Sequence, residues 1–319
     1  MNIESLSSLF SMFAYRVATM SLDTFLVQVF NGLSLFTVLA LMAVGLAIVF
    51  GLMGVINMAH GELMALGAYM TYMTSVVFHQ YFPELMGAYF LVGIMVAFVV
   101  TAGVGFVLER VMIRRLYHRP LDTMLATWGL SLVLQQVYRQ IFGPIDVSVP
   151  TVSWLQGAWN VTPNIGLPLS RIFILFLTFA VALAVYLFLF RSRWGLRIRS
   201  VMQNRAMAGA AGIDTERVDA VTFAVGCGLA GIAGSALTML ASTGPVTGQQ
   251  YIVDTFIVVV FGGIESLLGT FLSAFAIGQL QSMFELLLSG SMAKATILLL
   301  VIVALYFRPQ GLFALKLRR

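Results

Sequence analysis

Charged residues are scarce in this chain, and cysteine is almost missing from it. Asp, Glu, Lys and Arg make up only 10% of the 319 residues, whereas about 25% is usual for a soluble domain. A surface with so little charge does not stay dissolved in water, so a soluble globular protein is excluded. Cys227 is the only cysteine, which excludes an intrachain disulfide and a cysteine-based metal cluster.

Three functional signatures are missing as well. No G-x-x-x-x-G-K-[ST] loop occurs, because neither Lys294 nor Lys316 follows such a glycine, so any ATP has to be hydrolysed on another chain. His60 and Glu62 form an H-x-E sequence, but the P-C-x-x-C partner of a zinc deaminase is missing. We therefore expect no metal, no other cofactor and no enzyme activity. Glu4 and the lack of an early cation argue against a cleaved signal peptide.

Apolar residues are abundant instead, at 60% of the chain, with a mean hydropathy of +0.96. They fall into separate blocks of about 20 residues, the length that crosses roughly 30 Å of hydrocarbon. We expect an all-α, polytopic transmembrane helical bundle of eight or nine spans, forming a single permease domain over residues 22–319. The first apolar stretch, Leu6–Met20, is short and interrupted by Arg16, so we expect residues 1–21 to form an amphipathic helix at the membrane interface, with a disordered leader as the alternative. The spans are expected near 25–52, 61–79, 86–109, 121–142, 171–190, 218–242, 250–264, 268–288 and 293–308.

The cations between the apolar blocks indicate how the chain is oriented. The segments 110–120, 191–217 and 308–319 carry four, six and four of the 18 cations. The positive-inside rule then predicts a cytoplasmic C-terminus and an external N-terminus in a multi-pass membrane protein, and the family resemblance given below implies the bacterial inner membrane. Because the cations do not form one patch, they do not indicate a nucleic-acid partner. The external segment 143–170, rich in proline and tryptophan, predicts an ordered cap.

The segment from Gly51 to Glu62 interrupts what would otherwise be a continuous helix. Glycines alternate there with Asn57, His60 and Glu62. Irregular backbone at membrane depth persists only where protein or a watery cavity satisfies its polar groups. The segment therefore predicts a broken helix along a substrate path, and the alternative is a tight cytoplasmic turn with solvated polar residues.

A polar, alanine-rich segment lies within the cytoplasmic stretch 199–217. It is helical in propensity but too short to span a membrane, Gly212 stops it, and Asp214 can cap the next helix. We expect a coupling helix that a cytoplasmic ATPase moves, although a plain loop helix is the alternative. The expected coupling residues are Gln203, Asn204, Arg205, Ala206, Ala208, Ala210, Ala211 and Gly212.

Further polar groups interrupt other apolar spans. Ionisable groups in a membrane usually face an interior cavity, and Asp254 and Glu265 have no cation nearby in the sequence. The candidates for the translocation pathway are Asn57, His60, Glu62, Thr123, Thr127, Gln135, Gln136, Asp254, Thr255 and Glu265. For each one taken alone, a hydrogen bond between helices is the alternative. Small residues at four-residue spacing, such as Gly226, Ala230 and Gly234, predict close packing of helices.

Taken together, these segments resemble the permeases of the branched-chain amino acid family of ABC importers from about Leu22 to Leu312. The sequence Gly54-Val-Ile-Asn-Met-Ala-His-Gly61 matches a signature of that family, and Gln203–Ile213 looks like its coupling helix. Ala210-Ala211-Gly212 departs from the broader E-A-A-x-x-x-G motif, since the acidic residue is absent and the glycine comes early. The resemblance implies a second homologous permease subunit in a heterodimer, two ATP-binding subunits and an extracytoplasmic binding protein.

Within that family, residues 119–136, 150–157 and 248–256 look most like the urea permease branch. The resemblance therefore implies urea as cargo, with branched-chain amino acids as the first alternative. A path for neutral urea needs hydrogen-bond donors and acceptors but no fixed counter-charge. The side chains that could supply these donors and acceptors are Thr123, Thr127, Gln135, Gln136, Gln249 and Gln250. The rival class is an ion-coupled secondary transporter with Glu62, Asp254 or Glu265 as ion sites. An intramembrane enzyme built on His60 and Glu62 is weaker.

Overall fold

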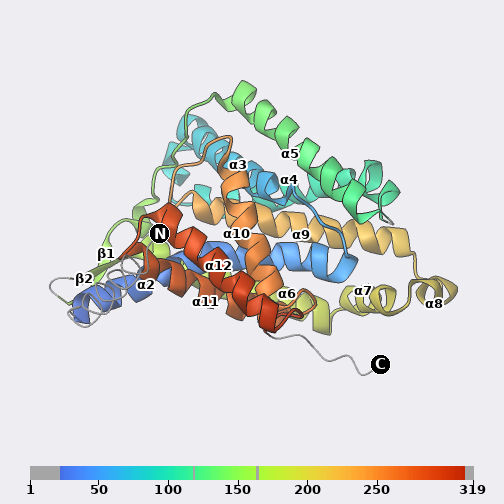
Figure 1. Cartoon of the computed structure of the whole chain (residues 1–319). Helices are drawn as coiled ribbons and strands as arrows, with labels where there is room; N and C mark the ends of the chain where they lie inside the picture. Colours follow the sequence, from blue (N-terminus) through green and yellow to red (C-terminus); the bar gives the residue numbers. More distant parts are fainter. Residues whose placement is uncertain (1–21, 118, 163–164, 313–319) are drawn as a thin grey trace.

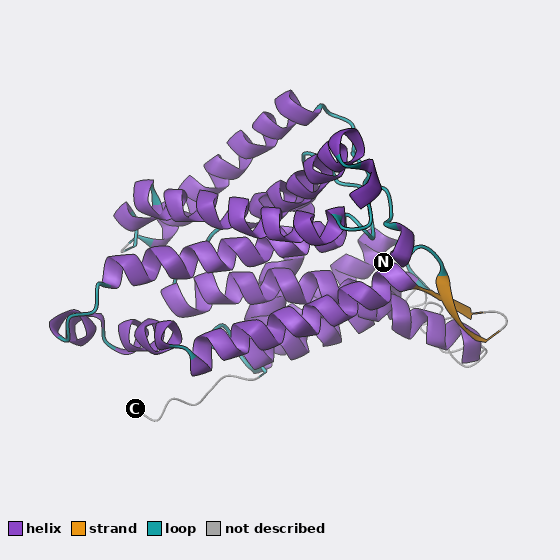
Figure 2. Ribbon diagram, turned by 180° about the vertical axis from the view of Figure 1, so that it is seen from behind, coloured by secondary structure: helices purple, strands orange, loops and turns teal. Residues whose placement is uncertain are grey.

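The computed structural model describes residues 22–117, 119–162 and 165–312. Helices dominate these residues and pack side by side in one bundle (Figures 1 and 2). The prediction of a helical bundle is therefore confirmed. The amphipathic helix predicted for residues 1–21 lies outside the described residues.

The helices of the described residues are joined by loops and short helical turns. They are α2 (Leu22–Ala47), continued by the π-helical turn η1 (Ile48–Leu52), α3 (His60–Tyr81), α4 (Tyr89–Val111), α5 (Pro120–Phe142), α6 (Leu169–Arg191), α7 (Arg193–Gln203), α8 (Arg205–Ala210), α9 (Thr215–Leu237), α10 (Thr247–Gly262), α11 (Leu267–Glu285) and α12 (Gly290–Phe307). Three 3₁₀ turns are η2 (Pro83–Leu85), η3 (Ile113–Arg115) and η4 (Ser153–Leu155).

One short β-hairpin departs from the expected all-α fold. Its strands β1 (Ala158–Thr162) and β2 (Ile165–Pro168) pair antiparallel within the segment that predicted an ordered cap. The cap is fastened to the bundle by two hydrogen bonds. Trp154 Nε1 donates to Gly87 O at 2.6 Å, and the Tyr89 hydroxyl donates to Pro150 O.

Six helices among the described residues are long and apolar enough to cross a membrane. They are Leu22–Leu52, Tyr89–Arg115, Leu169–Arg191, Thr215–Leu237, Leu267–Glu285 and Gly290–Phe307. Helices α3, α5 and α10 are not among them. Polar side chains interrupt α3 and α5, and α10 has only 16 residues. The count of eight or nine spans and the orientation in the membrane therefore remain predictions.

The basic segments gather at one end of the bundle. Residues 110–117, 191–217 and 308–312 lie at this basic end, and the β-hairpin lies at the opposite end, which we call the hairpin end (Figure 1). Arg114 of the first segment pairs with Glu216 of the second, and Leu312 N of the third donates to Phe261 O of α10. This clustering is what the charge pattern of the sequence requires.

Helix α9 is the centre of the bundle and packs against α2, α3 and α4 (Figure 1). Its small residues allow this, as their four-residue spacing predicted. Gly226 lies against Gly45 of α2, and Gly234 lies against the backbone of α3 at Met64 and Ala68. Because no hydrophobic force draws helices together in lipid, such close backbone packing supplies much of the association energy.

Candidate translocation and coupling sites

The break between α2 and α3 is confirmed by the structure. The helix ends in η1, and Gly54 adopts φ +69°, a left-handed conformation that a residue with a Cβ rarely takes. Residues 54–59 then run without regular structure to the start of α3. Asn57 is 1% exposed, and its Oδ1 accepts from Ala59 N at 3.1 Å. The polar residues Asn57, His60 and Glu62 are therefore buried in protein, whereas Gly54 at the turn itself is exposed.

Helix α5 turns a polar stripe toward this break. Thr123, Thr127, Ser131, Gln135 and Tyr138 recur every three or four residues and are buried. The opposite face of α5 carries exposed apolar side chains, including Leu121, Leu125, Val133 and Ile141. The stripe makes the contact with the irregular backbone, because Met58 N donates to Thr127 Oγ1 at 3.1 Å.

Glu62 occupies the centre of this seam between α3 and α5. The side chain is 1% exposed, and its Oε1 accepts from Gln135 Nε2 at 2.9 Å and from Ser131 Oγ at 3.1 Å. Tyr138 donates its hydroxyl to the carbonyl oxygen of Glu62 at 2.9 Å. Gln135 Nε2 also lies 3.5 Å from Gln249 Oε1, which brings the start of α10 to the seam. The seam thus holds a buried carboxylate ringed by hydroxyl and amide groups.

Sequence reasoning missed Ser131 and Tyr138 as members of this seam. Both extend the four-residue period that Thr123, Thr127 and Gln135 begin, so the period was the signal that could have identified them. Gln136 was predicted to line the same path, but its side chain is exposed on the other side of α5. Adjacent positions on a helix point about 100° apart, which explains the difference.

His60 faces away from Glu62 although only one residue separates them. Its Nε2 lies 3.3 Å from Met42 O of α2, and the ring packs beside Gly45. The imidazole is 0% exposed. Among the described residues no group of three or more His, Cys, Asp or Glu side chains could hold a metal ion.

Two predicted acidic pathway residues lie apart from the seam's hydrogen bonds. The fold brings Lys294 of α12 to Asp254, and their Nζ and Oδ2 atoms are 2.6 Å apart. Thr255 donates its hydroxyl to Tyr251 O within the same helix at 2.7 Å. Glu265 is exposed in the turn between α10 and α11. The structure thus brings Asn57, Glu62, Thr127 and Gln135 together, but it engages Asp254 and Thr255 elsewhere.

The predicted coupling helix is divided into two pieces. Gln203 ends α7, the Asn204 side chain caps α8 by accepting from Met207 N at 3.0 Å, and Gly212 ends the segment with φ +81°. Asp214 caps α9 as predicted, since its Oδ1 accepts from Arg217 N at 3.0 Å. Ala208 is buried against the bundle, so it is not part of an outer docking surface. The exposed residues of the segment include Ala206, Ala210 and Ala211.

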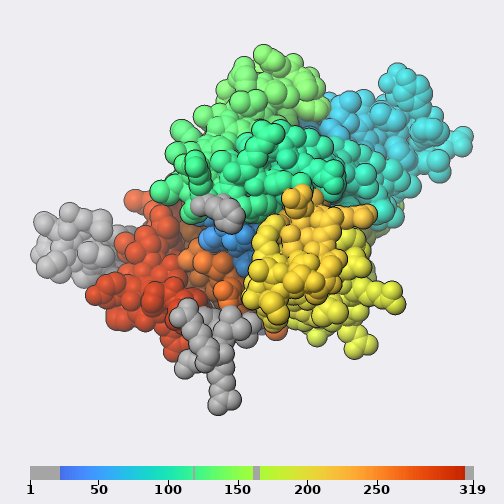
Figure 3. All heavy atoms as spheres, turned by 90° about the vertical axis from the view of Figure 1, so that its right-hand side faces the viewer, coloured from blue at the N-terminus to red at the C-terminus, as the bar shows by residue number. Residues whose placement is uncertain are grey.

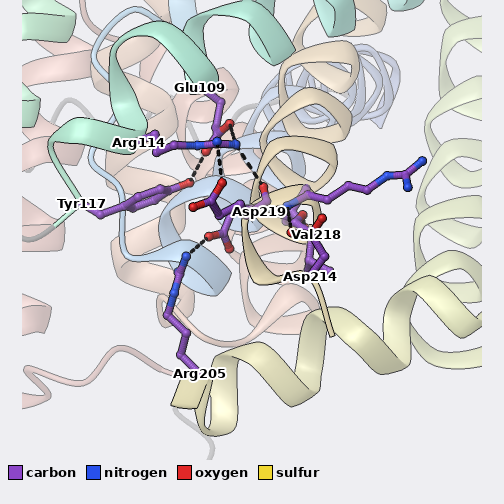
Figure 4. A network of polar contacts seen from close by, with 10 residues as sticks. Glu109, Arg114, Tyr117, Arg205, Asp214, Val218 and Asp219 are labelled. Carbon is purple, nitrogen blue, oxygen red and sulfur yellow. Dashed lines mark hydrogen bonds and ion pairs between the residues drawn. The ribbon is translucent and has the colours of Figure 1, made fainter. Parts of the chain in front are cut away.

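A network of charges fastens α8 to the bundle (Figure 4). Arg205 Nη2 at the start of α8 lies 2.7 Å from Asp219 Oδ2 of α9. Arg114 bridges Glu109 of α4 at 3.3 Å and Glu216 of α9 at 2.8 Å. The sequence indicated only topology for these arginines, so their pairing was not foreseen.

Tyr117 completes the network by donating its hydroxyl to Glu109 Oε1 at 3.2 Å. Burial, together with the Asp219 and Glu109 carboxylates, raises the pKa of the Tyr117 phenol well above its usual range. The phenol therefore stays protonated and remains a donor. Beside it lies a cavity of about 180 Å³ at the basic end, lined by residues that include Leu52, Ile198 and Thr222. Figure 3 looks onto this end, where the surface is hollowed between the sequence-distant parts of the chain.

These features define a class of protein. Apolar helices around a buried polar seam, with a short helix at the basic end, are the features that the sequence predicted for a membrane-embedded transport subunit. The chain belongs to the family described as branched-chain amino acid transport system, permease component, which matches residues 28–305.

Curated relatives agree with this family. The high-affinity branched-chain amino acid transport system permease protein LivH of Escherichia coli K12 is 30% identical over 90% of this chain and 95% of its own length. Protein BraD of Pseudomonas aeruginosa is 28% identical with the same coverage, and a probable LivH of Methanocaldococcus jannaschii is 27% identical. These relatives are transport permeases and not enzymes, and this chain is a multi-pass inner-membrane protein. No solved structure matches.

Proposed function

We propose that this chain is the membrane-spanning permease subunit of an ABC importer for branched-chain amino acids. The observation that carries the proposal is the buried seam around Glu62, a polar interior in a chain whose family and relatives are named as branched-chain amino acid permeases. Each unpaired polar group that is buried in a membrane costs roughly several kcal/mol of stability. A polar interior of this kind therefore indicates a functional role and not a structural one. The route would follow the α3–α5 seam past Asn57, Thr127 and Gln135.

The proposed partners follow from the family and from the exposed helix α8. They are a second, homologous permease subunit, two ATP-binding subunits and an extracytoplasmic binding protein. An ATP-binding subunit would contact α8, because this helix stands at the basic end and is tied to α9 through Arg205 and Asp219. Motion of α8 would then reach the helix at the centre of the bundle.

Urea is a second candidate cargo, favoured by the chemistry of the seam. Glu62, Gln135 and Gln249 supply acceptors and donors for a small neutral molecule. None of the hydrogen bonds or ion pairs that reach Glu62 within the described residues comes from a cation, so the carboxylate of an amino acid would find no counter-charge there. The resemblance of residues 119–136 and 248–256 to urea permeases supports the same cargo. The named relatives nevertheless favour branched-chain amino acids.

Uptake by cells that lack this gene tests the function and the cargo together. We expect deletion to abolish high-affinity uptake of radiolabelled leucine, isoleucine and valine at micromolar concentration, and re-expression to restore it. Lost urea uptake with unchanged leucine uptake would select urea instead. Purified chain alone in liposomes provides the control for the rival class, since transport driven by a proton or sodium gradient without ATP-binding subunits would contradict an importer.

The outer surface of α8 gives a second prediction. Replacing exposed Ala210 by Glu places a charge on the proposed docking surface without disturbing the bundle. We expect co-purification of the ATP-binding subunits and uptake to fall by about tenfold, because an unpaired interfacial charge costs on the order of 1 to 3 kcal/mol. Gln140→Glu, on the exposed side of α5 and far from α8 in the chain, is the control and should leave both unchanged. Full binding by the Ala210 variant would remove α8 from the interface.

A further inference from the structure

The seam contains buried polar atoms that the protein itself does not satisfy. Among the described residues, Glu62 Oε2, the Tyr69 hydroxyl and Thr243 Oγ1 have no hydrogen-bond partner, although all three side chains are almost fully buried. Folded proteins pair nearly all of their buried polar atoms, so each exception calls for a physical reason. Three exceptions in one region call for a shared reason.

Two of these atoms belong to α3, and the third belongs to the loop that follows α9. Thr243 lies in the loop after α9, where its backbone pairs with Val147 at the end of the α5 connection. Tyr69 is two turns along α3 from Glu62, on the same face, and its ring lies 5.2 Å from the ring of Tyr138, which donates to the carbonyl oxygen of Glu62. Glu62 Oε2 and the Tyr69 hydroxyl therefore belong to one face of α3, beside α5.

The surroundings fix what Glu62 can still accept. Ser131 and Gln135 both donate to Oε1, which holds the carboxylate in one orientation and leaves Oε2 without a donor. Beside it, the Tyr69 ring stacks on Phe142 at 4.1 Å and lies 5.2 Å from the Tyr138 ring. A carboxylate oxygen can only accept, so the missing partner has to be a donor.

Resting on the proposed transport function, we infer that Glu62 Oε2 and the Tyr69 hydroxyl form a recognition site for an N–H-bearing group of the cargo. The group is the ammonium of an amino acid or an NH₂ of urea, which share this donor chemistry. Glu62 lies in the first turn of α3, where the helix dipole favours a negative charge. A carboxylate in the first turn can simply stabilise its own helix. The Glu62 carboxylate instead accepts hydrogen bonds from Ser131 and Gln135 of α5 and does not cap α3.

The test uses the complete importer reconstituted in liposomes, with ATP hydrolysis and uptake measured on the same vesicles. ATP-dependent uptake by the wild type tests the proposed function. The molecule that is taken up, leucine or urea, then identifies the N–H group as an ammonium or an NH₂. In Glu62→Gln, an amide NH₂ takes the place of the Oε2 acceptor. Two donors, this NH₂ and the N–H of the cargo, then face each other and cannot form a hydrogen bond. We expect uptake per ATP hydrolysed to fall about tenfold, since hydrogen bonds to charged groups have effects of this order. Glu285→Gln is the matched control, because Glu285 also accepts from a glutamine, Gln281, at 2.9 Å.

Tyr69→Phe separates recognition from folding. It removes only the hydroxyl and keeps the stacked rings. If Tyr69 had only a structural role, removing its unpaired hydroxyl would leave the protein equally or more stable, and uptake would be normal. We expect unchanged or raised thermal stability together with a two- to fivefold loss of uptake per ATP. Wild-type uptake per ATP in both variants, or losses that only follow the amount of assembled complex, would overturn the inference while leaving the transport function intact.

Discussion

Replacing Gly234 by alanine is expected to remove most of the folded protein from the membrane. A Cβ at this position would lie 2.7 Å from Ala68 N and closer still to Met64 O. Both are backbone atoms of α3, so neither can rotate away as a side chain would. Overpacking typically costs about 1 to 3 kcal/mol, and we expect the upper end or more here because two helices have to separate.

The measurement is the yield and thermal stability of detergent-solubilised protein on a size-exclusion column. Gly103→Ala in α4 is the matched control, because a Cβ there would meet no atom within 4 Å. Alanine has a higher helix propensity than glycine, so Gly103→Ala should leave the thermal stability equal or slightly higher. A Gly234→Ala protein with wild-type yield and melting temperature would show that α3 and α9 are less tightly packed than the structure shows.

The second large effect is expected at the ion pair between α8 and α9. Asp219→Asn keeps the shape of the side chain but removes the charge that faces Arg205. Asp219 is 6% exposed, so water does not replace the lost partner well. If α8 receives the motion of the ATP-binding subunit, this pair passes it to α9. Coupling between sites commonly amounts to about 5- to 150-fold, and we expect uptake to fall about thirtyfold.

ATP hydrolysis by the assembled complex should persist in this variant, which distinguishes lost coupling from lost assembly. Arg205→Lys keeps the charge and should retain part of the uptake. The control is Asp122→Asn, since the pair of Asp122 with Arg119 is 3.6 Å long and exposed on both sides. Equal uptake per ATP in Asp219→Asn and the wild type would exclude the ion pair from the coupling route.

Local patterns in the sequence predicted the features that depend on neighbouring residues. The apolar blocks predicted α2, α4 and α6, and Asp214 was correctly predicted as the cap of α9. The break after Gly51 was also foreseen, because glycines and polar residues disrupt a helix wherever they cluster. These features rest on propensities within one or two turns.

Contacts between distant helices could not be predicted in the same way. Lys294 reaches Asp254 across 40 positions, and Ser131 reaches Glu62 across 69. No local rule distinguishes a carboxylate that will be paired from one that will not, because the partner is set by how helices pack. For that reason Asp254 and Glu62, which look alike in the sequence, have different surroundings in the fold.

The polar side chains of α3 and α5 and the short length of α10 have a consequence for biosynthesis. A segment that leaves the ribosome enters the bilayer on its own only when its transfer into lipid is favourable, and charged residues at its centre oppose this. α5 carries Asp122 and Arg139 near its two ends and amides between them, and α10 is short. We expect these helices to be retained at the translocon until their apolar neighbours α4, α9 and α11 have emerged, so the order of synthesis becomes part of how the polar seam is built.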